Sequence, residues 1–250
     1  MAPENRSLIE RAPGDDWRQL QDRVATILTE CGMTTEVAKT IHVARGSVEV
    51  DVYAEDPTTR PRGVYICECK LWRSRVPQAR VQTFRTIIGD AGAHFGIFVS
   101  AGGFQAGALE VVQHTNVHLL NWVEFQALFA KRWCTVHLAP TVRAECGVLA
   151  SHAEMPGNDA PIRHSHGEAI NEAEAVGSMV NGFWSPPFVE LGIGNDQQSI
   201  VDEIWEERDA YLPYLPQSVA EAASLRELLD ALVTFAREWK RSRAEPPRDA

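Results

Sequence analysis

The sequence has no uninterrupted apolar run near the ~18 residues that a membrane-spanning helix needs. Its opening residues, MAPENRSLIERAPGDD, are too polar for the apolar stretch of a signal peptide. Its five cysteines are odd in number, and none lies in the paired CxxC spacing of a zinc ribbon. At 44% hydrophobic and 23% charged residues, the composition argues against wholesale disorder. These absences predict a globular, cytoplasmic protein with reduced thiols and no membrane partner.

A net charge of −10 argues at first against a nucleic-acid partner, but that charge is confined to one part of the chain. Residues 1–140 carry 15 acidic and 15 basic residues, whereas residues 141–250 carry 19 acidic and 9 basic residues. The segment 60–85 holds one acid, Glu68, and seven bases: Arg60, Arg62, Lys70, Arg73, Arg75, Arg80 and Arg85. Because a polyanion responds to the local field, this segment either faces nucleic acid or forms an ordinary solvated surface.

The first half of the chain alternates between helical and strand patterns. Apolar residues at helical spacing predict a first helix over 16–31, with Trp17 on its apolar stripe. Strands are predicted over 33–43, 47–53, 64–69, 94–100 and 117–120, and further helices over 77–92, 104–114 and 122–133. This order predicts an α/β domain in which helices cover a small mixed sheet.

The second half has helical patterns only. They cover residues 139–153, 168–183 and 197–212, and a last helix follows a predicted capping box of Ser218 and Glu221. We therefore predict two domains, residues 15–133 and an acidic helical domain over residues 139–245, with the boundary between Trp133 and Ala139.

Three charged residues interrupt otherwise apolar strands. Because side chains alternate between the faces of a sheet, Glu68 and Lys70 are predicted to point together, with Cys67 and Cys69 on the opposite face. Asp51, on the preceding antiparallel strand, is predicted to bring its carboxylate beside that of Glu68. Two adjacent carboxylates repel unless a cation lies between them, and oxygen ligands suit Mg²⁺, with Mn²⁺ as a substitute.

Lys70, beside such a metal, is placed to hold an attacking water and to stabilise charge on the phosphorus of a phosphodiester. The alternative interpretation is a surface ion pair of Glu68 and Lys70. The apolar surroundings favour the site, because charged groups are rare on buried strands without a function.

Four segments together resemble the Mrr-like restriction endonucleases of the PD-(D/E)xK nuclease superfamily. They are GSVEVDV (46–52), ICECKLW (66–72), HFGIFVSAGGFQAG (94–107) and VHLLNWVEFQAL (117–128). The resemblance covers about residues 15–133 and implies a restriction-endonuclease-like fold. It also implies metal-dependent endonucleolytic cleavage of DNA, with Asp51, Glu68 and Lys70 as the catalytic set, Asp51 and Glu68 as metal ligands, and a role in defence against foreign DNA.

Three further residues are candidates for supporting the site. Gln21 stands on the first helix where many relatives carry a glutamate, which argues against a second metal site built from this helix. Glu49 is predicted on the same strand face as Asp51, where it adds a ligand or hydrogen bond or else lies in water. Gln82 lies on the helix that follows the motif, on the face opposite its apolar residues.

A second set of residues near the motif is expected to contact DNA phosphates or to form a solvated helix face. This set is Arg73, Arg75, Gln78 and Arg85. The glycines of SAGGF (100–104) either present amides to a phosphate or form a plain tight turn.

The predicted function is therefore a metal-dependent endodeoxyribonuclease. Two alternatives remain open: a non-catalytic nucleic-acid-binding or scaffold subunit, towards which Gln21 leans, and an RNase of the same mechanism. Phosphates would repel the acidic helical domain, so we expect it to serve in dimerisation, regulation or partner docking. Cleavage of both strands with one site per chain favours a homodimer.

Overall fold

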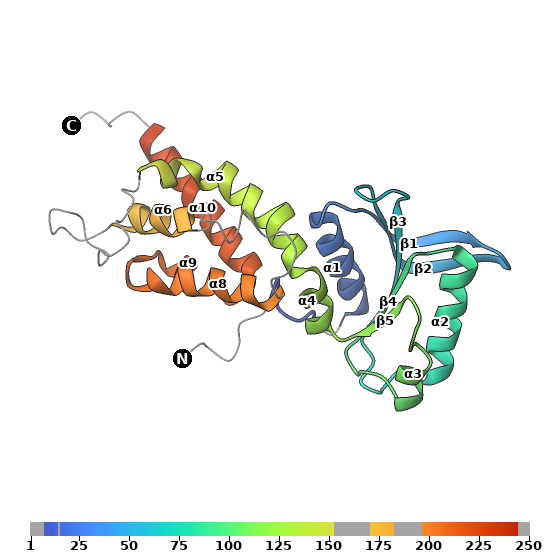
Figure 1. Cartoon of the computed structure of the whole chain (residues 1–250). Coiled ribbons are helices and arrows are strands. Elements are labelled where there is room, and N and C mark those ends of the chain that lie inside the picture. The colour runs from blue at the N-terminus through green and yellow to red at the C-terminus, as the bar shows by residue number, and fades with distance from the viewer. Residues whose placement is uncertain (1–7, 15, 153–170, 183–196, 245–250) are drawn as a thin grey trace, which may run out of the picture. The chain divides into compact units, whose positions relative to one another are not determined.

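The structure, a computed structural model, describes residues 8–14, 16–152, 171–182 and 197–244 (Figure 1). The chain divides into two compact units, one of residues 12–129 and one of residues 1–11 with 130–250. None of the helices in the described ranges is both long and apolar enough to cross a membrane.

The unit of residues 12–129 is built on a five-stranded sheet whose strands lie in chain order. The strands are β1 (Thr34–Val43), β2 (Gly46–Asp56), β3 (Gly63–Lys70), β4 (Phe95–Ser100) and β5 (Val117–Leu120). β1, β2 and β3 pair antiparallel, whereas β3, β4 and β5 pair parallel. The prediction of a mixed sheet is confirmed.

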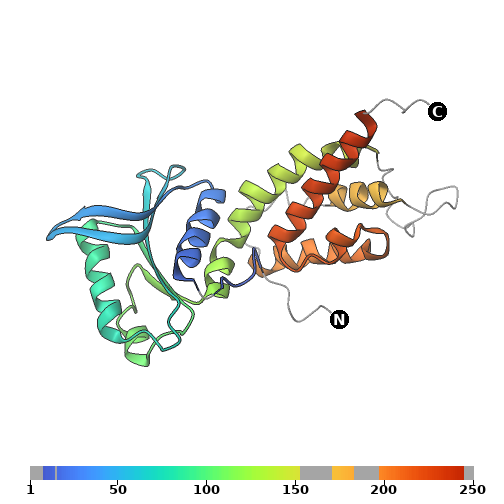
Figure 2. The ribbon, with the colours of Figure 1, turned by 180° about the vertical axis from the view of Figure 1, so that it is seen from behind.

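Helices cover both faces of this sheet (Figure 1, Figure 2). α1 (Trp17–Glu30) packs against β1, β2 and β3 on one face. On the other face, α2 (Gln78–Ala91) packs against β1 and β4 and lies beside α3 (Ala106–Glu110). Strands covered on both faces are apolar along most of their length, which is why a charged residue within them is informative.

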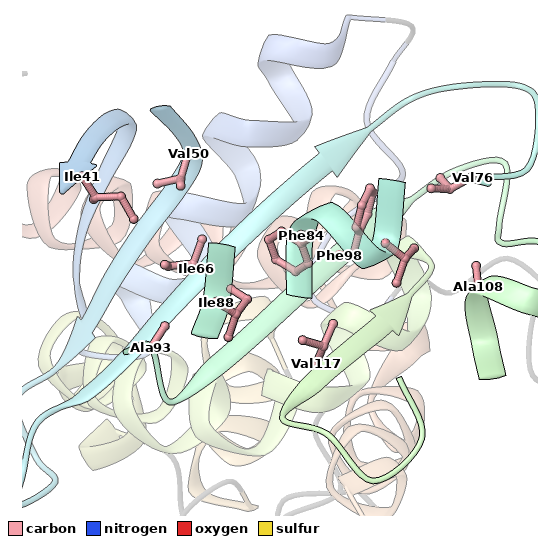
Figure 3. Close-up of a cluster of buried hydrophobic side chains, with 11 residues drawn as sticks. Ile41, Val50, Ile66, Val76, Phe84, Ile88, Ala93, Phe98, Ala108 and Val117 are labelled. Carbon is pink, nitrogen blue, oxygen red and sulfur yellow. The ribbon is translucent and has the colours of Figure 1, made fainter. Parts of the chain in front are cut away.

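A cluster of buried apolar side chains lies between the sheet and α2 (Figure 3). It consists of Ile41, Val50, Ile66, Val76, Val81, Phe84, Ile88, Ala93, Phe98, Ala108 and Val117. Ile66 of β3 points into this cluster, so strand alternation directs Glu68 and Lys70 to the same face, just beyond it. Cys67 and Cys69 are buried on the opposite face, as predicted.

The predicted helix over 104–114 is shorter in the structure, because α3 spans only Ala106–Glu110. The chain after Glu110 is held in turns by side chains. Thr115 donates a hydrogen bond to the Val112 carbonyl, and the Asn116 amide donates to the carbonyls of Ala93 and His94. These bonds compete with helix continuation and direct the chain into β5.

Gly102 allows the loop after β4 to approach the loop after β3. A Cβ at this position would lie 2.4 Å from the Trp72 carbonyl oxygen and 2.6 Å from that of Ser74. Close backbone approach therefore accounts for this glycine of the SAGGF segment. The plain turn is the better interpretation, since α3 is also too short to form a helix N-terminal anion site.

We expect Gly102→Ala to destabilise the fold by about 1–3 kcal/mol, because the added methyl forces two backbone segments apart. Gly89→Ala is the matched control, since a Cβ there, in the last turn of α2, meets nothing within 4 Å. It should stabilise by about 0.4–1 kcal/mol. Chemical denaturation of both variants measures the difference, and a Gly102→Ala protein as stable as the wild type would contradict the packing argument.

The second unit is helical in its described residues, as predicted. Its helices are the end of α4 (Trp122–Trp133), a π-helical turn (Cys134–Leu138), α5 (Ala139–His152), α6 (Glu172–Gly182), α8 (Gln197–Ala210), a 3₁₀ turn (Leu212–Tyr214), α9 (Gln217–Ala220) and α10 (Leu225–Ala244). Residues 153, 168–170 and 183 of the predicted helices lie outside the described residues. Where the sequence predicts the domain boundary, the helix continues through the π-helical turn.

The predicted capping box of Ser218 and Glu221 is wrong. The pattern Ser-x-x-Glu occurs a second time at Ser224 and Glu227, and this second copy caps α10. The Glu227 N–H donates to Ser224 Oγ at 3.3 Å, and the Ala223 N–H donates to Glu227 Oε2 at 2.9 Å. Spacing alone cannot distinguish two copies of one motif that lie six residues apart.

Candidate active site

Strands β2 and β3 separate at Asp51. Their ladder pairs Val52 with Cys67 and does not continue to Asp51 and Glu68. Beyond this point, the Cys69 N–H donates a hydrogen bond of 2.7 Å to Asp51 Oδ2. A side-chain carboxylate thus replaces the backbone carbonyl that a continued ladder would supply, and this bond fixes the orientation of Asp51.

The alternation of β2 is interrupted at the same place. Val48, Val50 and Tyr53 all pack against the cluster beneath α2, although strict alternation would place Tyr53 on the opposite face from the other two. Ala38 of β1 lies between Val37 and Lys39, which pair with Val52 and Val50, and it has a φ of +51°, in the left-handed region. This local distortion turns the Asp51 side chain towards β3.

The structure brings the three predicted residues together. Lys70 Nζ lies 3.1 Å from Asp51 Oδ2 and 2.7 Å from Glu68 Oε1. The three side chains are between 19% and 27% exposed. They therefore form a partly buried trio rather than a solvated ion pair at the surface.

The electrostatics of the trio follow from its burial. Burial and the negative charge of Asp51 raise the pKa of Glu68, although Lys70 and Arg80 act in the opposite direction. Burial alone would lower the pKa of Lys70, but hydrogen bonds and charge interactions with Glu68 and Asp51 outweigh it, so the pKa of Lys70 is raised. The ammonium thus stays charged and satisfies both carboxylates.

The carboxylate oxygens of Asp51 and Glu68 fit a hard divalent cation. Two carboxylates already share one positive charge, and their oxygens are the ligands that Mg²⁺ and Mn²⁺ prefer. Within the described residues, no group of three or more His, Cys, Asp or Glu side chains could hold a metal. Asp51 and Glu68 would therefore supply two ligands, and Mg²⁺ commonly completes its shell with waters and substrate phosphate.

The three candidate supporting residues differ in how exposed their side chains are. Gln21 is buried at 5% exposure on α1, where a neutral amide costs less to desolvate than a carboxylate. Glu49 is exposed, and no described hydrogen bond or ion pair joins it to the trio. Gln82 is exposed on α2. Their supporting roles stay predictions.

The predicted phosphate-contacting residues are exposed: Arg73, Arg75, Gln78 and Arg85. Gln78 lies close to Gly107 of α3, where a Cβ would come within 2.6 Å of its Oε1. Arg80, which the sequence predicts only as one of seven bases in segment 60–85, also acts on the site, because its charge acts on the Glu68 carboxylate. Its position in the first turn of the helix that follows the motif is the signal that could have identified it.

Two members of the trio, Asp51 and Lys70, line a pocket of about 500 Å³. Its lining is Trp17, Asp51, Cys69, Lys70, Leu71 and Trp72. Trp17 is 47% exposed, so the prediction that it packs on the apolar stripe of α1 is wrong. The buried part of that helix begins at Leu20, and Trp17 extends past it to the pocket.

The comparison with protein families agrees with this geometry. Residues 15–129 match the family model Mrr_cat, described as restriction endonuclease, and the matched range contains the whole trio. A solved structure titled "Crystal Structure of Protein of Unknown Function AF1548" is similar at 14% identity, with a TM-score of 0.39, over 78% of this chain and 97% of that chain. No curated protein matches the chain.

Proposed function

From the match of residues 15–129 to the restriction endonuclease family model Mrr_cat, we propose that the chain is a metal-dependent endodeoxyribonuclease. The observation that carries the proposal is the trio of Asp51, Glu68 and Lys70, two members of which, Asp51 and Lys70, line a pocket. A non-catalytic scaffold has no need of such a trio, because burying charged groups costs free energy unless they serve a purpose.

Each member of the trio has a separate role. Asp51, oriented by the Cys69 N–H, and Glu68 would hold Mg²⁺ through their carboxylate oxygens. When bound, such an ion neutralises phosphate charge and makes a water more acidic. The Lys70 ammonium donates hydrogen bonds to the attacking water or to a phosphate oxygen as negative charge develops there. None of the three serves as a covalent nucleophile.

DNA is the substrate that the restriction endonuclease family favours, and defence against foreign DNA is the role we propose with it. Arg73, Arg75 and Arg85 are exposed near the motif and would contact phosphates without reading sequence. We assign homodimerisation, or the docking of a partner protein, to the helical unit. A chain that is monomeric both free and on DNA would contradict the homodimer.

Incubation of supercoiled plasmid with the purified chain tests the proposal. We expect nicked and linear products with Mg²⁺ or Mn²⁺, none with a chelator, and recovery when excess Mg²⁺ is returned. The reason is that carboxylates alone cannot neutralise the phosphate they must approach. Parallel incubation with RNA separates the RNase alternative. Binding of plasmid without nicking under every metal condition would instead support the scaffold.

A further inference from the structure

Two exposed tryptophans lie at the candidate active site. Six tryptophans fall within the described residues, and Trp122, Trp133 and Trp205 are each 9% exposed or less. Trp17 and Trp72 are 47% and 38% exposed, and both line the pocket that Asp51 and Lys70 also line. Tryptophan side chains are usually well buried, so two exposed ones at a single pocket point to a ligand rather than to the core.

Each of these rings has an arginine guanidinium beside it. The Arg18 guanidinium lies 4.5 Å from the Trp17 ring centroid, and that of Arg80 lies 5.9 Å from the Trp72 centroid. Each of the two rings therefore has a positive charge beside it, and the Lys70 ammonium lines the same pocket as the rings. Aromatic rings interleaved with basic groups are typical of sites that bind unpaired nucleotides, where rings stack on bases and cations contact phosphates.

The two rings come from different elements. Trp17 begins α1, which covers one face of the sheet, whereas Trp72 lies in the loop after β3, two residues beyond Lys70. A base in an intact duplex has both of its faces covered by neighbouring bases. Only an unpaired nucleotide offers a free π face to such rings.

We propose that Trp17 and Trp72 stack on unpaired nucleotides next to the phosphate that the trio cleaves. The inference rests on the proposed nuclease function and adds its substrate class: single-stranded DNA, or duplex that is locally unpaired at an end, a mismatch or a branch. Arg18 and Arg80 hold the adjacent phosphates. The expected ligand of the pocket is a polyanion with exposed bases, because the positive charges and the tryptophan rings both match such a ligand.

Binding of a short fluorescently labelled oligonucleotide, followed by anisotropy in the presence of a chelator, tests this without cleavage. Trp17→Ala and Trp72→Ala are each expected to weaken binding of single-stranded DNA about 5- to 150-fold, the range typical of one stacked base. Binding of the matching duplex should change much less. The phenylalanine variants should recover most of the affinity, since they retain a stacking face.

Trp239→Ala is the matched control. Trp239 is half-buried on α10 and carries Arg243 at 4.6 Å from its ring centroid, but it belongs to the helical unit. It should bind single-stranded DNA like the wild type. Thermal unfolding of the three alanine variants checks folding, and because Trp17 and Trp72 are exposed their melting temperatures should stay close to the wild-type value.

Wild-type affinity of Trp17→Ala and Trp72→Ala for single-stranded DNA would overturn the proposal, as would equal losses on single strands and duplex. Plasmid cleavage that persists alongside such a result would leave the nuclease function intact and remove only the stacking role. Conversely, failure of the wild type to cleave any substrate would count against the nuclease function, whereas the metal-free binding assay would still report on the rings.

Discussion

Asp51→Asn should reduce metal-dependent cleavage by roughly 10³-fold or more, because several kcal/mol of charge stabilisation depends on a metal that this carboxylate helps to hold. Asparagine has nearly the same shape and can still accept the Cys69 N–H bond that Asp51 Oδ2 accepts at 2.7 Å. The local backbone is therefore retained, while the negative charge is lost. Initial rates of plasmid nicking, with wild type and variant at equal concentration, measure the effect.

Glu110→Gln is the control for Asp51→Asn, since it removes the same charge from an exposed position on α3 in the same unit. It should cleave at the wild-type rate. Glu49→Gln is a further test variant. Reduced cleavage would indicate a ligand role for Glu49, whereas cleavage at the wild-type rate would indicate a solvated carboxylate at the strand edge. Nicking by Asp51→Asn at the wild-type rate would remove the trio from the mechanism.

The trio could be predicted from the sequence because its members obey local rules. Alternation in β3 places Glu68 and Lys70 on one face, and the apolar residues around them mark the strand as buried. The antiparallel order of two neighbouring strands then brings Asp51 within reach. These rules involve only neighbours in the chain or across one ladder, so periodicity captures them.

The features that were missed depend on packing between distant segments. Period-two alternation predicts Glu49 and Asp51 on one face, but the alternation is interrupted between Val50 and Tyr53, so the rule fails at the candidate active site. Trp17 continues the helical spacing of Leu20 and yet is exposed, because burial is decided by what covers the helix. A hydrophobic pattern shows which residues could be buried, whereas only the tertiary structure shows which ones are.

Lys70→Met should separate catalysis from metal binding. Cleavage is expected to fall by about 10²–10³-fold, the usual loss when one charge-stabilising donor is removed from an active site. Binding of Mn²⁺ should persist or tighten, because the ammonium at 2.7 Å and 3.1 Å from the two carboxylates competes with a metal for the same oxygens. Isothermal titration calorimetry with Mn²⁺, beside a nicking assay, measures both quantities.

The pH dependence of Mn²⁺ binding sharpens this test. Lys70 acts to lower the pKa of Glu68, so its removal raises that pKa further above the ordinary carboxyl value. A protonated carboxyl is a poor ligand, and the Mn²⁺ affinity of Lys70→Met should therefore begin to fall at a higher pH than that of the wild type. Asp51→Asn should bind Mn²⁺ weakly at every pH. If Lys70→Met loses Mn²⁺ binding at neutral pH as Asp51→Asn does, the ammonium is part of the metal site's structure and cannot be the separate donor inferred from its position.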